Sequence, residues 1–211
     1  MNKQILDALN WRFATKVFDP SKKVSEENLR TILETGRLSP SSFGIEAWKF
    51  LVIENPELRG KIRDAGYGQT QIADASHLIV ITRRTDVRER ITDELVERTS
   101  KTMQIEPEKL DSLKQMLQGS IMGRSDADLD AWVRSQAYIA LGMMMETASL
   151  LNIDNAALEG FNPAAVDEIL GLGDKRLAST CLMVVGYRVE DPTAKRPKVR
   201  RAFEEVVEFI K

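Results

Sequence analysis

Residues 132–161 read WVRSQAYIALGMMMETASLLNIDNAALEGF, and this stretch decides the fold that we expect. Its apolar residues recur at helical spacing over 132–151, and from Ala137 onward they spread around most of the circumference. A helix that is apolar on most sides must be covered on several sides. Its length would span a bilayer, but Arg134 and Glu146 argue against a membrane. The stretch therefore predicts the central helix of a soluble core, covered in part by a second copy of the chain.

A glycine turn follows the predicted central helix. The chain passes through a short segment, 155–158, into the turn Glu159-Gly160-Phe161. A turn that is supported by a buried helix can hold a ligand rigidly. This turn is therefore a candidate ligand contact.

Bulk composition excludes several classes of function. The chain has 211 residues, 43% hydrophobic and 29% charged, with no evident linker, so we expect a single domain over residues 1–211. A net charge of −2 gives no reason to expect nucleic acid or an anionic membrane as a partner. Cys181 is the one cysteine and no signal-like segment opens the chain, which together indicate a reducing cytoplasm. With His77 as the one histidine, no zinc-type ligand cluster is expected, and we predict no metal site.

Hydrophobic periodicity, together with capping and turn-forming residues, predicts the remaining helices and strands. We expect helices over 3–10, 26–37, 56–65 and 163–170 and strands over 48–53, 78–82 and 178–187. Residues 86–125 are charged and helical, and within them Met103–Met122 is either a flexible cover over a ligand site or an ordinary surface hairpin. The apolar end of the chain, Val206–Ile210, predicts a strand that pairs with another subunit.

Basic side chains that are candidates for ligand binding lie near both ends of the chain. Arg12 and Lys16 lie near the N-terminus, and a basic cluster occupies 195–201. Each group is either an anion site or a solvated basic run, since spacing alone does not separate these alternatives. No hydrolytic triad, phosphate-binding loop or paired carboxylates accompany them. Such a pattern suits a protein that anchors a cofactor, while the cofactor supplies the chemistry.

Seven short motifs, in their order and spacing, carry a family resemblance. They are RFATK at 12–16, SPSS at 39–42, WKF at 48–50, DASH at 74–77, Gln136, LEGF at 158–161 and KVR at 198–200. This set resembles the nitroreductase family, the oxygen-insensitive NAD(P)H nitroreductases and dihydropteridine reductase-like flavoenzymes. The resemblance covers nearly the whole chain and is weakest over 86–125. It implies an α+β fold with a mainly antiparallel sheet wrapped by helices. It also implies an intertwined homodimer with exchanged C-terminal strands and two FMN sites at the subunit interface.

The resemblance assigns basic side chains to two parts of FMN. Arg12, Lys198 and Arg200 match residues that bind the phosphate, a charge-assisted contact. Lys16 matches a lysine at the pyrimidine edge, where a cation stabilises the reduced flavin.

The resemblance also assigns the flavin ring contacts. Glu159 and Gly160 match a turn whose backbone N–H groups approach N5 and O4, where the chemistry occurs, so no catalytic side chain is predicted and solvent supplies the protons. The remaining implied cofactor-binding residues are the loop Pro40, Ser41 and Ser42 from the other subunit, the edge residues Gln69 and Gln71, and Ala14 and Leu158.

Several positions depart from the family pattern. Ala14 stands where serine is common, and Gln71 where an enterobacterial relative has lysine. Phe43-Gly44 replaces a more polar pair, and Glu46-Ala47 replaces Gln-Pro. These departures affect the expected redox potential and substrate preference more than FMN binding.

The resemblance implies an FMN enzyme that takes hydride from NADH or NADPH. It then passes two electrons, by ping-pong chemistry, to a nitroaromatic, a quinone or another small acceptor. Two alternatives stay open: a specialised enal, pteridine or free-flavin reductase, and a flavin-binding or redox-sensing protein without turnover. We expect Met103–Met122 to cover the substrate side.

Overall fold

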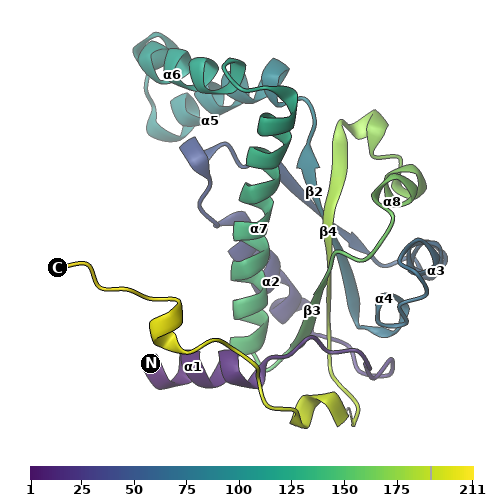
Figure 1. Ribbon diagram of the computed structural model, residues 1–211. Helices are drawn as coiled ribbons and strands as arrows, with labels where there is room; N and C mark the ends of the chain where they lie inside the picture. The colour runs from purple at the N-terminus through teal and green to yellow at the C-terminus, as the bar shows by residue number, and fades with distance from the viewer. Residues whose placement is uncertain (191) are drawn as a thin grey trace.

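A four-stranded antiparallel sheet is the centre of the computed structural model, which describes residues 1–190 and 192–211 (Figure 1). The strands are β1 (Trp48–Ile53), β2 (His77–Arg84), β3 (Asp154–Leu158) and β4 (Leu177–Gly186), in the order β1-β2-β4-β3. The register between β2 and β4 shifts at Ile81/Thr82, a β-bulge. The predicted α+β class and antiparallel sheet are confirmed.

The central helix covers one face of this sheet. It is α7 (Asp126–Leu150), and α2 (Glu26–Arg37) packs beside it. Inward residues of β2 and β4 such as Ile79 and Met183 meet Met144 of α7 there. The helix begins six residues before the apolar stretch, because the Ser125 side chain caps its first turn by accepting from the Asp128 N–H.

Three helices cover the other face. They are α3 (Pro56–Ala65), α4 (Gln71–Asp74) and α8 (Pro163–Leu170). Strand residues that alternate with the first set, among them Val80 and Val184, form this second core. The continuous apolar runs in β2 and β4 follow from burial on both faces.

The N-terminal segment packs against α7 and the edge of the sheet. Helix α1 (Asn2–Trp11) packs against α7, and the chain then runs beside the edge strand β3. Ala14 forms a parallel bridge with Asn155. This contact places residues 12–16 along β3.

Residues 86–125 form a helical excursion at one end of α7 (Figure 1). A π-helical turn leads into α5 (Thr92–Met103), and α6 (Asp111–Met122) returns the chain to α7. Leu117 and Ile121 of α6 are buried in a separate core with residues of α7, so the segment is more firmly packed than its loose pattern predicts.

The C-terminal tail runs past α1 and then away from the body of the protein (Figure 1). Residues 206–210 form no strand within the described chain, and Phe209 and Ile210 are exposed. A strand there requires a partner, as the sequence prediction assumed. Among the described residues, no helix is long and apolar enough to cross a membrane.

Candidate functional site

Three cations from the two ends of the chain form a cluster. Arg12 follows the end of α1, and the Lys198 ammonium donates a hydrogen bond to the Arg12 carbonyl. Burial and then the charge of Arg200 lower the pKa of Arg12. Burial, followed by the charges of Arg12 and Arg200, lowers the pKa of Lys198. Within residues 1–190 and 192–211, none of the three forms a salt bridge, so the cluster is suited to an added anion.

A buried carboxylate fixes the segment that carries Arg12. Asp154, at the start of β3, accepts from the Thr15 hydroxyl at 3.2 Å and pairs with the Arg188 guanidinium at 2.7 Å. That guanidinium also lies 4.2 Å from the centre of the Trp11 ring and 4.7 Å from that of Phe13. The network therefore locks both flanks of Arg12, and sequence reasoning missed it because its members are distant in the chain.

Ala14 and Lys16 lie on the exposed side of the same segment. Ala14 is engaged through its backbone bridge to Asn155, which agrees with a residue that offers no side-chain hydrogen bond. The Lys16 side chain is exposed and available to a ligand along β3.

The turn after Leu158 presents an available backbone donor. The Phe161 N–H donates to the Glu159 carbonyl at 2.9 Å, which closes a tight turn around Gly160. Within the described chain, the Gly160 N–H has no hydrogen-bond acceptor. A Cβ at Gly160 would meet only the Gln69 amide, at an ordinary 3.7 Å, and its φ is not left-handed. Neither packing nor backbone conformation therefore requires glycine here, whereas close approach by a ligand would.

Both candidate glutamines lie beside this turn. The Gln69 amide donates to the Gly160 carbonyl at 2.6 Å, and the Gln71 amide donates to the Gln69 side-chain oxygen at 3.1 Å. Gln71 is only 4% exposed, which leaves it little surface for direct contact with a ligand.

The loop of Pro40, Ser41 and Ser42, which we call the hydroxyl loop, is held by a side chain of α7. The Ser42 N–H donates to Gln136 at 2.8 Å, and the Ser41 hydroxyl accepts from the Glu46 N–H at 3.0 Å. Phe43 and Glu46 both adopt left-handed φ angles, 57° and 47°, so this network holds a strained loop.

Within one chain the hydroxyl loop is far from the cation cluster. Asn155, which pairs with Ala14, reaches the carbonyl of Met145 on α7. Nine residues of helix, about 14 Å, separate Met145 from Gln136. The structure thus brings together Arg12 with Lys198 and Arg200, and Gln69 and Gln71 with Gly160, while Pro40, Ser41 and Ser42 of the same chain lie away from the cation cluster.

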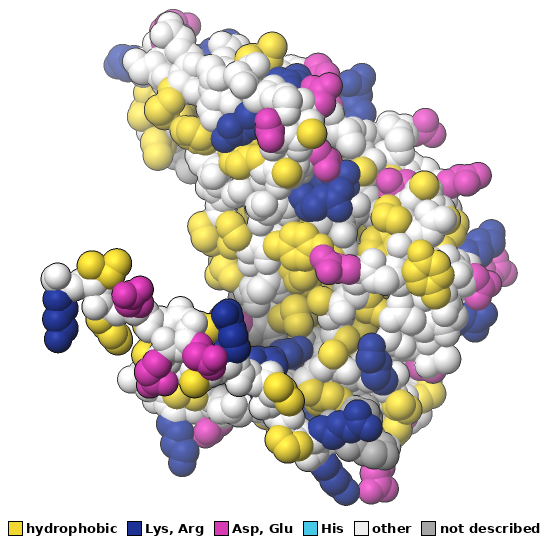
Figure 2. Space-filling view, viewed as in Figure 1, with side chains coloured by type: hydrophobic (Ala, Val, Ile, Leu, Met, Phe, Trp, Pro, Cys, Tyr) yellow, Lys and Arg dark blue, Asp and Glu magenta, His cyan; other side chains and the backbone are white. Residues whose placement is uncertain are grey.

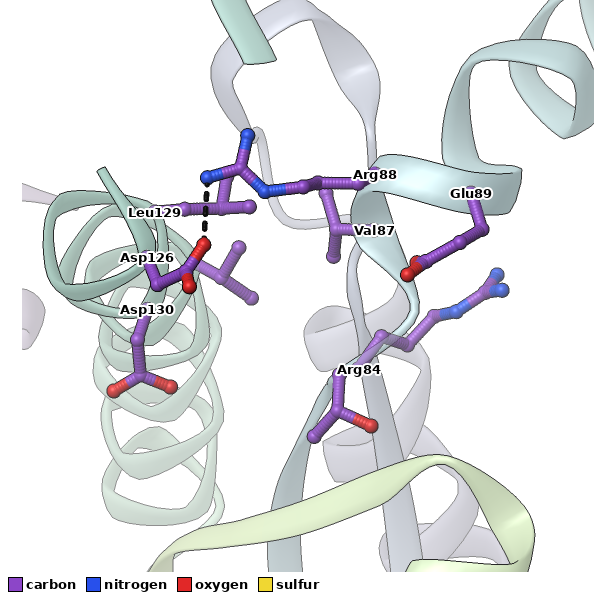
Figure 3. A pocket seen from close by; sticks show the side chains of 9 residues that line it. Arg84, Val87, Arg88, Glu89, Asp126, Leu129 and Asp130 are labelled. Atoms are coloured by element: carbon purple, nitrogen blue, oxygen red, sulfur yellow. Dashed lines mark hydrogen bonds and ion pairs between the residues drawn. The ribbon is translucent and has the colours of Figure 1, made fainter. Parts of the chain in front are cut away.

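A hollow of about 330 Å³ at the base of the helical excursion is a separate feature (Figure 3). Arg88 extends across it to Asp126 at 2.9 Å, and also donates to the carbonyls of Ile121 and Arg124. Arg84 at its edge is paired with Asp86 at 2.8 Å. The contacts of Arg88 join the two ends of the excursion, so we assign the hollow a structural role.

Comparison with known proteins identifies the family. The chain belongs to the nitroreductase family, whose model matches residues 9–187. It is 41% identical to "Putative NAD(P)H nitroreductase YfkO" of Bacillus subtilis, over 100% of this chain and 99% of that protein. It is 38% identical to a Staphylococcus aureus protein of the same description, over 100% of this chain and 97% of that one.

Solved structures share the fold at lower identity. A Bacillus subtilis nitroreductase structure, ydfN, superposes with a TM-score of 0.87 at 18% identity, over 100% of both chains. The structure of a family member in complex with FMN, from Exiguobacterium sibiricum, has a TM-score of 0.83 at 20% identity, over 98% of this chain and 97% of that one. The nitroreductase-like fold expected from the motifs is confirmed.

Proposed function

We propose that this protein is a cytoplasmic, FMN-dependent oxidoreductase that takes hydride from NADH or NADPH and reduces a small electron-poor acceptor. The cluster of Arg12, Lys198 and Arg200 is the observation that carries the proposal, because three cations that form no salt bridge within the described residues fit a phosphate dianion. The NAD(P)H nitroreductase names of the full-length relatives and the FMN complex of a structural neighbour support the cofactors.

The residues of the chain would divide the binding of FMN between them. Arg12, Lys198 and Arg200 would hold the phosphate, and Lys16 would lie at the pyrimidine edge. The Gly160 N–H, which has no acceptor in the described chain, would donate to the reactive edge of the ring. FMN, when bound, supplies two-electron transfer, and the chain supplies position and electrostatics.

A second copy of the chain would complete this site. Apolar side chains are exposed on α1 (Leu6), on α7 (Ile139) and along the tail (Phe203 and Phe209). Figure 2 shows hydrophobic side chains on the hollowed face between the helical excursion and the tail. A patch of this kind marks an interface. A homodimer with exchanged tails would cover it and would bring Pro40, Ser41 and Ser42 of one chain to the other chain's cofactor.

The helical excursion, 86–125, would cover the substrate side. Met103, Met116 and Met122 are exposed on it, and methionine adapts to varied ligands. Because Leu117 and Ile121 are buried, a deletion would damage the core. Replacing the three exposed methionines with serine is the better test: acceptor range should change while FMN stays bound. Loss of FMN in that variant would contradict a substrate-side cover.

Steady-state kinetics with a panel of acceptors tests the proposed function. Nitroaromatics, quinones, enals, pterins and free flavins would each be varied against NADH and NADPH. Parallel double-reciprocal lines with a nitroaromatic or quinone of highest kcat/KM would support the proposal. A highest kcat/KM for an enal, a pterin or free flavin would indicate a specialised reductase instead. No turnover with any acceptor would indicate a flavin-binding or redox-sensing protein.

A further inference from the structure

The Glu159–Gly160 turn is held from both faces of the sheet. On the face covered by α4, Gln69 donates to the Gly160 carbonyl at 2.6 Å and to the Gly66 carbonyl at 3.0 Å. On the face covered by α7, the Tyr138 hydroxyl donates to the Glu159 carboxylate. The turn is exposed, yet both of its residues are attached to buried elements.

Gln71 reinforces the orientation of the Gln69 amide. Its own Nε2 donates to the Gln69 side-chain oxygen at 3.1 Å, so the Gln69 NH₂ group must face Gly160. Because Gln71 is buried, its side chain has little freedom to turn away. Without it, the Gln69 side chain would keep its two carbonyl acceptors but lose the hydrogen bond at its oxygen, so its amide would be held less firmly against the Gly160 carbonyl.

On the other side of the turn, the Tyr138 hydroxyl donates a hydrogen bond to the Glu159 carboxylate. Burial, and then the hydrogen bond to Glu159, raises the pKa of Tyr138, so its hydroxyl stays protonated through the neutral range. Within the described residues no Lys or Arg pairs with the Glu159 carboxylate. Tyr138 is therefore the side chain that restrains Glu159.

The restrained peptide is the one that carries the available donor. The Glu159 carbonyl accepts from the Phe161 N–H at 2.9 Å, and this hydrogen bond polarises the peptide whose N–H belongs to Gly160. A polarised, preorganised N–H stabilises charge at a reacting edge more than a mobile one does.

We propose that Gln71 and Tyr138 are positioning residues, which hold the Glu159–Gly160 turn so that the Gly160 N–H faces the reactive edge of the cofactor. This inference rests on the proposed function. Gln71 therefore acts through Gln69 and the backbone, and not by touching the flavin ring.

The test measures amide hydrogen exchange of the turn in the FMN-free protein and then flavin reduction in the FMN-bound protein. The variants are Gln71→Met, which keeps the length of the side chain and loses the donor without adding a charge, and Tyr138→Phe. In the FMN-free protein, residue-resolved amide hydrogen exchange of Phe161 should accelerate by up to about tenfold in each variant, the effect of losing one hydrogen bond. In the FMN-bound protein, the rate constant for reduction by NADH or NADPH should fall by up to about tenfold, while the Kd for FMN changes less than about threefold.

Matched controls remove the same groups elsewhere. Gln118→Met, on the exposed face of α6, and Tyr187→Phe, just after β4, should leave both readouts unchanged. Unchanged Phe161 exchange, or faster exchange with wild-type reduction rates, would overturn the positioning role. Failure of wild-type protein to be reduced by either nicotinamide would count against the proposed function instead, and the exchange measurement would then decide whether the turn is held in this way.

Discussion

Removing two of the three clustered cations should weaken FMN binding strongly. The perturbation is Lys198→Met with Arg200→Met, which keeps much of the side-chain volume and removes both charges. Arg12 stays in place, so part of the phosphate site survives. In the protein without FMN these three charges repel one another: after burial, the charges of the neighbouring cations are the second cause of the lowered pKa values of Arg12 and Lys198. The variant loses the hydrogen bond from Lys198 to the Arg12 carbonyl but also relieves this repulsion, so we expect it to fold.

The expected magnitude follows from charge-assisted hydrogen bonds. Each such bond contributes about 1.5–3 kcal/mol, and neighbouring contacts to one phosphate are not fully additive. We therefore expect a loss of about 3–5 kcal/mol, or roughly 100- to 4,000-fold in Kd.

Fluorescence titration of FMN-free protein with FMN, at one fixed salt concentration, measures this Kd. A matched control is Lys195→Met with Arg201→Met, which removes the same charge from exposed positions of the same tail. Screening over about 8 Å at physiological salt should limit its effect to a fewfold change. A Kd for the test variant within threefold of wild type would refute the phosphate assignment. An equal loss in the control would show that the effect is a general charge effect and not a specific contact.

Three further predictions concern single positions. Gly160→Ala should leave Tm unchanged, because the added Cβ meets only an ordinary contact, but it should weaken FMN binding. The control is Gly119→Ala, at a helical glycine with open space around it, and equal FMN affinity of both variants would contradict a ligand at Gly160. Arg59→Met should cost at least about 3 kcal/mol in urea unfolding, because the carbonyls of residues 72, 75 and 76 lose their donor; a cost below about 1 kcal/mol would exclude that role. The hydrogen bond and the charge of Arg84 together outweigh desolvation and lower the pKa of Asp86. Arg84→Met should therefore lower the free energy of unfolding by about 3 kcal/mol at neutral pH, and this difference should shrink as pH falls through the depressed pKa. A pH-independent difference would contradict the linkage.

Local signals explain why several helices and one strand were predicted with their observed bounds. Ser25 caps α2 by accepting from the Asn28 N–H, and Asn55 before Pro56 caps α3. Asn162 does the same for α8. These signals are contained within a few residues, so the sequence alone is enough to read them.

Other features depend on contacts that local patterns do not contain. The start of α7 was placed too late, because its first turns are polar and only the Ser125 cap marks them. The pairing of Asp154 with Arg188 depends on the alignment of β3 with β4. The placement of Gln71 at the flavin edge stays a prediction, and its hydrogen bond to Gln69 was not foreseen because that contact depends on how the turn before α4 folds.

The most direct test of whether the protein is a flavin reductase is the visible absorption spectrum of the purified protein, recorded under argon before and after addition of NADPH or NADH. An FMN-dependent reductase should show the absorption bands of oxidised flavin, and at least one nicotinamide should bleach them. Yellow protein that does not bleach would contradict the reductase assignment and favour a flavin-binding or sensing role. Colourless protein that takes up no added FMN would contradict the cofactor assignment itself.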